Sequence, residues 1–107
     1  MTSTDHSGCA DVIDVIVTAE AEGTYRFDVT VRSSDTGWDK YADLWEVRSP
    51  DGTSLGRRVL THPHVEEQPF TRSQNGIAVP DGVATVTVVA RDSVTGFCGA
   101  AYEVDLP

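Results

Sequence analysis

Hydrophobic and polar residues alternate with a period of two along most of this chain. The clearest case is residues 25–32, where Tyr25, Phe27, Val29 and Val31 are separated by polar residues. Successive side chains of a β-strand point to opposite faces, so this pattern predicts a strand with one buried face. Similar patterns predict six more strands, over residues 13–19, 40–48, 55–60, 76–79, 83–91 and 100–106. No window of the sequence has the 3.6-residue period of a helix.

Short strands separated by turn signals every 8–12 residues are typical of β-sandwiches. We therefore expect an all-β fold, an immunoglobulin-like or fibronectin-III-like sandwich of about seven antiparallel strands. A small barrel or a jelly roll is the alternative. A flexible N-terminal segment, residues 1–10, should precede a single domain over residues 11–107. The expected core includes Phe27, Val29, Trp45, Val86, Val88 and Tyr102.

Three connections should gather at one end of this sandwich if successive strands run in opposite directions. They are residues 33–39, 61–69 and 92–97, and the start of the first strand lies at the same end. This places all three histidines together: His6, His62 and His64. We expect residues 61–70 to be ordered and to pack against Trp38 and residues 92–96, with Phe70 as an apolar plug.

His62 and His64, separated by one proline, form the sharpest chemical pattern. In an extended segment residues i and i+2 lie on the same side, so both imidazoles can reach one metal ion. Imidazole and carboxylate ligands suit Zn or Cu(II). The remaining candidate ligands are His6, Glu66 and Glu67.

Two other interpretations of this region remain open. In the first, the imidazoles hold the loop in place by stacking on Trp38 or by hydrogen bonding to its backbone. In the second, the loops bind an unknown protein or small ligand. Arg72 either pairs with Glu66 or Asp92 or grips an anionic ligand, and Trp38 either caps the core or stacks on a ligand. The candidate contact residues are Trp38, Asp39, His62, His64, Glu67, Arg72 and Asp92.

Composition and motifs exclude several function classes. The 17 acidic and 8 basic residues give a net charge of −9, which argues against binding to nucleic acid or anionic membranes. No apolar stretch is long enough to span a membrane. Nucleophile and metalloprotease motifs are absent, and the adjacent Glu66 and Glu67 would face opposite ways in an extended loop. We expect a monomer that is not an enzyme and has no cofactor, the possible Zn or Cu apart.

The two cysteines bear on the cell compartment. Cys9 shares its parity with Ile13, and Cys98 shares its parity with Ala100, so both should point inward at the same end of the sandwich. A disulfide between them would fit an oxidising compartment, and two buried free thiols are the alternative. Ser-Gly-Cys at residues 7–9 also hints at lipoprotein acylation, although no apolar segment precedes it.

The N-terminal residues leave the compartment open. Residues 1–8 are polar and form no signal peptide. The protein is therefore expected in the cytoplasm, or in the periplasm or outside the cell if the chain begins at the mature end of an exported protein.

Four segments resemble a family of small exported bacterial proteins of uncharacterised function: GWDKYADLWEV, PDGTSLGRRVL, THPHVEEQPFTRS and ARDSVTGFCG. The family patterns are G-W-D-x-Y-A-D-x-W-x-V and H-P-H-x-x-E-Q-P-F-T-R-S, and the resemblance covers residues 11–106. It implies a small β-sandwich in the cell envelope and no established activity. The motif positions it implies are His62, His64, Glu67, Gln68, Phe70, Thr71 and Arg72.

Two positions depart from this family. Members tend to carry histidine where this chain has Thr95, which weakens a metal site that would use that loop. They also tend to carry glycine where this chain has Cys98, so a disulfide would be particular to this protein.

Overall fold

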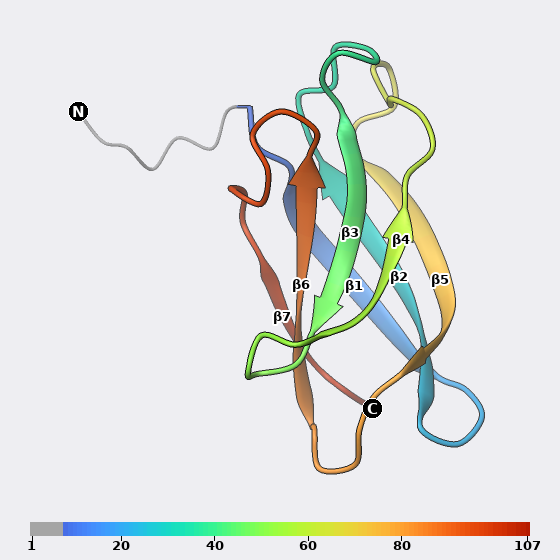
Figure 1. Cartoon of the computed structure of the whole chain (residues 1–107). Coiled ribbons are helices and arrows are strands. Elements are labelled where there is room, and N and C mark those ends of the chain that lie inside the picture. The colour runs from blue at the N-terminus through green and yellow to red at the C-terminus, as the bar shows by residue number, and fades with distance from the viewer. Residues whose placement is uncertain (1–7) are drawn as a thin grey trace.

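The computed structural model describes residues 8–107, and these residues form two β-sheets that face each other. One sheet has the order β1-β2-β5 and the other has the order β4-β3-β6-β7, with all neighbours antiparallel (Figure 1). The strands are β1 (Asp11–Ala19), β2 (Thr24–Arg32), β3 (Ala42–Arg48), β4 (Ser54–Val59), β5 (Phe70–Ala78), β6 (Thr85–Asp92) and β7 (Tyr102–Asp105). The predicted seven-stranded antiparallel sandwich is confirmed.

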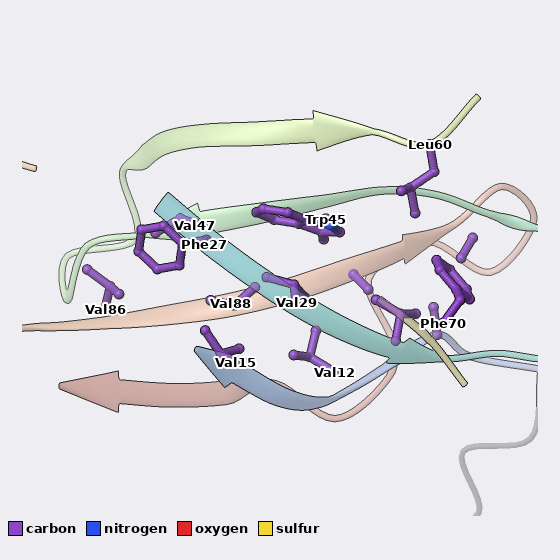
Figure 2. Packing of buried hydrophobic residues seen from close by; sticks show 14 of the residues in the cluster. Val12, Val15, Phe27, Val29, Trp45, Val47, Leu60, Phe70, Val86 and Val88 are labelled. Atoms are coloured by element: carbon purple, nitrogen blue, oxygen red, sulfur yellow. The ribbon is translucent and has the colours of Figure 1, made fainter. Parts of the chain in front are cut away.

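The core lies between the sheets and consists of the apolar residues of alternating strands. Trp45 of β3 is fully buried at its centre, next to Val29 of β2 and Val88 of β6 (Figure 2). Phe70 and Leu60 lie at one end of the cluster (Figure 2). All the predicted core residues are buried except Tyr102, which is half-buried and packs against the cluster.

The first strand and the last two strands differ from the prediction. The register of β1 against β2 shifts between Val12 and Asp14, so Val12 and Val15 are buried while Ile13 is only half-buried. The predicted inward position of Ile13 is therefore wrong, because a bulge changes the parity of every residue before it. The predicted strands 83–91 and 100–106 are shorter in the structure, and Ala84 and Ala100, which their alternation would place inward, are exposed and lie outside β6 and β7.

The fifth strand is longer than the sequence predicts. The expected strand starts at residue 76, whereas β5 starts at Phe70 and is nine residues long, with seven of its residues paired to β2. Val31 of β2 lies opposite Phe70, and both side chains are buried. Residues 70–73 are therefore a part of the sheet, which gives the preceding connection a firm C-terminal attachment.

The connections divide between the two ends of the sandwich. We name the end with residues 33–41, 60–69 and 93–101 the loop pole, which is the upper end in Figure 1. The opposite end, with residues 20–23, 49–53 and 79–84, is the turn pole. The three connections predicted to gather at one end do so. Within the described part of the chain, no helix has the length and apolar character needed to cross a membrane.

Candidate binding surface at the loop pole

A buried carboxylate joins two of the three connections at the loop pole. Asp35 is only 7% exposed and accepts hydrogen bonds from the backbone N–H of Ala42 at 3.0 Å and of His64 at 2.8 Å. The Ser33 hydroxyl donates a third hydrogen bond to it at 2.5 Å. A buried carboxylate is stable only when its oxygens are satisfied in this way. Asp35, which the sequence did not single out, therefore anchors residues 60–69.

Gln68 makes a second connection between the same segments. Its Oε1 accepts a hydrogen bond from the backbone N–H of Ser33 at 2.9 Å, and its Nε2 donates to the carbonyl oxygen of His64 at 2.8 Å. The expected order of residues 61–70 therefore has a clear physical basis. The contacts reach residues 33–35, which precede Trp38 in the same connection.

The His64 ring is buried at the loop pole, where the residue is only 4% exposed. It stacks on Phe70 with ring centroids 3.9 Å apart and planes inclined by 10°. Arg72 Nη2 lies 3.0 Å from His64 Nε2 and 3.1 Å from Glu67 Oε1. Because arginine only donates, Nε2 must accept, and the proton of the neutral ring sits on Nδ1. Burial, together with the positive charge of Arg72, lowers the pKa of His64.

This geometry corrects two predictions about the loop. His64 stacks on Phe70, not on Trp38, and Arg72 pairs with Glu67, not with Glu66 or Asp92. Phe70 is 1% exposed and plugs the end of the core as predicted. The position of the Arg72 side chain follows from the alternation along β5. Phe70 points into the sandwich, and Arg72, two residues later, lies on the same side of the strand.

The two imidazoles lie close together, with ring centroids 4.5 Å apart. His62 is exposed, and its Nδ1 lies 3.0 Å from the carbonyl oxygen of Pro63. Among residues 8–107, no group of three or more histidine, cysteine, aspartate or glutamate residues could hold a metal ion. His6 lies outside the described residues. The Nε2 atom of His64 already accepts from Arg72, so a metal at that nitrogen would have to displace the guanidinium group.

The third connection is held by a buried ion pair. Lys40, the only lysine of the chain, contacts the carboxylate of Asp92, whose side chain is fully buried. Asp92 Oδ1 also accepts from the backbone N–H of Val94 at 2.8 Å and of Thr95 at 3.2 Å. Burial opposes ionisation of Asp92, but Lys40 and these N–H groups outweigh it and lower its pKa. Asp92 therefore organises residues 93–97 and is not open to a partner.

Each connection also exposes a large apolar side chain, and the connection 93–101 exposes two, Val94 and Phe97. Trp38 is 68% exposed and packs edge-on against Tyr41 with ring centroids 5.6 Å apart. Val65 is 50% exposed and Val94 is 63% exposed. Of the two roles considered for Trp38, capping the core is therefore wrong. Asp39, beside Trp38, is also exposed.

A disulfide closes the loop pole. Cys9 and Cys98 are bonded, with Cα atoms 5.4 Å apart. Both were predicted to point inward, but Cys9 is half-buried and Cys98 is exposed, because Cys9 precedes the bulge in β1 and Cys98 lies outside β7, where strand parity does not apply. The Cys9 sulfur is committed to this bond, so the acylation suggested by Ser-Gly-Cys at residues 7–9 does not fit the structure.

Comparisons with known proteins show that the chain is similar in sequence to part of a larger protein. No family model and no solved structure matches it. A relative described as a putative lipoprotein, from Halomicrobium mukohataei, is 42% identical over 96 residues. The match covers 90% of this chain and 47% of the relative, so the chain spans about half the length of the curated relative that it matches. Over nearly its whole length, this chain is thus similar to one part of a putative lipoprotein.

Proposed function

We propose that this chain is an exported, non-enzymatic binding domain that engages a partner protein through the loop pole. The observation that carries the proposal is Trp38, which is 68% exposed on a connection whose two ends are held by Asp35 and Lys40. Val65 and Val94 present further apolar surface from the other two connections.

Rigidity makes these side chains suited to binding. Immobilising a loop on association costs conformational entropy, and a loop that is already hydrogen-bonded avoids much of that cost. Tryptophan adds a large contact area with only two rotatable bonds, and it is enriched among the residues that dominate binding energy. Three loops that display such residues from a β-sandwich use the scaffold as antibody variable domains do.

The polar groups of the loop pole favour binding over catalysis. Arg72 hydrogen-bonds to both His64 and Glu67, and Lys40 forms an ion pair with Asp92. A general acid or base needs access to a substrate proton, and these groups are committed to holding the loops.

Export is supported by two independent observations. The disulfide between Cys9 and Cys98 is of the kind that persists in oxidising compartments, outside the cytoplasm. The similar protein from Halomicrobium mukohataei is described as a putative lipoprotein. Together they favour a location in the cell envelope or outside the cell.

The test is site-specific photo-crosslinking in the native host. A photoreactive phenylalanine analogue replaces Trp38, and in a matched control it replaces Ile16, which is 59% exposed on β1, away from the loop pole. We expect an adduct of discrete mass from position 38 and none from position 16. The absence of an adduct, or the same adducts from both positions, would count against the proposal.

A quantitative test follows once the adduct identifies the partner. We expect Trp38→Ala to weaken binding of the purified partner by about 2 kcal/mol or more, because truncated hot-spot residues lose that much. Isothermal titration calorimetry measures the affinity, with Ile16→Ala as the control. Equal affinities for the two variants would place the contact elsewhere on the molecule.

A further inference from the structure

The charged side chains in the connections of the turn pole are all acidic, whereas the loop pole contains both acidic and basic side chains. The three connections of the turn pole, residues 20–23, 49–53 and 79–84, contain four carboxylates and no lysine, arginine or histidine. The carboxylates are Glu20, Glu22, Asp51 and Asp81. In addition, Asp105 lies near residue 85, whose hydroxyl donates to it at 2.9 Å. Positive ligands are therefore favoured at this end, and the net charge of −9 acts in the same sense.

An open apolar cavity lies between two of these connections. Its volume is about 390 Å³, within the usual range for small-molecule sites. Leu55 and Val83 in its lining also pack against the main core, whereas Pro50 and Pro80 are exposed. The full lining is Ser49, Pro50, Asp51, Thr53, Leu55, Pro80 and Val83.

Asp51 is the only charged residue of that lining. Its carboxylate accepts hydrogen bonds from the Ser49 hydroxyl and, at 3.0 Å, from the backbone N–H of Thr53. These hydrogen bonds lower the pKa of Asp51 to about 2. The cavity therefore has apolar walls with a fixed negative charge among them.

We propose that this cavity binds a small cationic amphiphile, whose hydrocarbon body contacts the two prolines, Leu55 and Val83 while its protonated amine faces Asp51. Apolar walls favour the hydrocarbon because they remove its surface from water. The lining holds no basic group, so an anionic ligand of the same shape meets only repulsion. The inference is independent of the binding proposed for the loop pole, which lies at the other end of the sandwich (Figure 1).

Three probes of nearly equal shape test this inference: phenethylamine, 2-phenylethanol and 3-phenylpropionate. Each is titrated into the isotope-labelled protein, and amide chemical shifts are followed by NMR. We expect saturable shifts at the lining residues, with the amine bound about fivefold more tightly than the alcohol, the factor expected for one partly solvated charge pair. The acid should bind most weakly.

Two matched variants locate the charge. Asp51→Asn keeps the oxygen that accepts from Ser49 and Thr53 but removes the charge, so the preference for the amine over the alcohol should disappear. Asp81→Asn removes a charge from the neighbouring turn, outside the lining, and should leave the preference in place. If the chemical shifts do not saturate at about 20 mM amine, the affinity is too weak for a specific site, and the inference is overturned. Equal binding of all three probes, or an unchanged preference in Asp51→Asn, would also overturn it.

Discussion

His64 is held in a neutral form by its surroundings at the scale of a single residue. One face of its ring lies on Phe70, and its Nε2 accepts a hydrogen bond from Arg72. Its Nδ1 is buried and has no hydrogen-bond partner among residues 8–107. A proton added at Nε2 would break the bond to Arg72 and place two cations in contact. Among the charged groups that face it, His62 adds to this opposition, while Glu67 and Asp35 reduce it.

We therefore expect the protein to lose stability as the pH falls below about 6.5, the ordinary pKa of histidine. The folded-state pKa of His64 is lowered, so the unfolded chain takes up the proton first. The stability is fully present above the unfolded pKa and is lost as the pH falls towards the folded pKa. Each unit of pKa difference contributes about 1.4 kcal/mol.

The measurement is urea unfolding between pH 7.5 and pH 5, at intervals of about half a unit, which resolves a single titration. His64→Gln removes the titrating group and should flatten the pH dependence. His62→Gln removes only one of the smaller causes that lower the pKa of His64, so this variant should keep most of the pH dependence. If the free energy of unfolding changes with pH in His64→Gln as it does in the parent, a group other than His64 causes the pH dependence.

At the scale of elements, the segment between β6 and β7 is pressed against the start of β1. Val12 donates its backbone N–H to the carbonyl oxygen of Ala100 at 2.9 Å, and Asp11 Oδ1 accepts from the N–H of Ala100 at 2.7 Å. Gly99 directly precedes Ala100. A β-carbon at Gly99 would overlap the carbonyl oxygen of Ala10, which belongs to the backbone and cannot rotate away.

Gly99→Ala should therefore force the two segments apart. We expect it to lower the free energy of unfolding by about 1–3 kcal/mol, the usual cost of overpacking at a tight contact. Urea unfolding measures the loss, with Ala101→Val, a change at an exposed neighbour, as the control. If Gly99→Ala is as stable as the parent, residues 97–101 do not pack against β1 as described.

At the scale of the whole molecule, one disulfide links the two ends of the chain. Cys9 and Cys98 are 89 residues apart in sequence and join the start of β1 to the segment before β7. Gly8, next to Cys9, accepts hydrogen bonds through its carbonyl oxygen from Lys40 and from Thr95, both at 2.7 Å. The disulfide therefore also positions the backbone that helps to hold two connections of the loop pole.

The double variant Cys9→Ser, Cys98→Ser should be less stable by about 4–5 kcal/mol, because in the loop-closure model a cross-link over this length lowers the entropy of the unfolded chain by an equivalent amount. Urea unfolding of the parent with and without a reducing agent should show a similar difference. The reducing agent should have no effect on the double variant. Equal stability of the parent and the double variant would mean that the strands alone close the structure.

Much of the fold was predictable from the sequence because the alternation of hydrophobic and polar residues indicates a strand and its buried face. The parity of Phe27, Val29 and Val31 is enough to place the buried face of β2, and the order of strands and turns places three connections at one end. The order of the strands also placed Cys9 and Cys98 at the same end, although the inward position predicted for both was wrong. The prediction from alternation failed for Ile13 because a bulge inserts one residue without any local sign in the pattern.

The partners at the loop pole were decided only by the tertiary structure. Arg72 forms its ion pair with Glu67 and not with Glu66. His64 stacks on Phe70, and Trp38 is exposed. These choices depend on how residues 60–69 lie against residues 33–35, which is set by hydrogen bonds spanning 29 and 35 residues of sequence. Residue type and spacing indicate which groups can interact. The distance and direction between segments far apart in the chain determine which of them do.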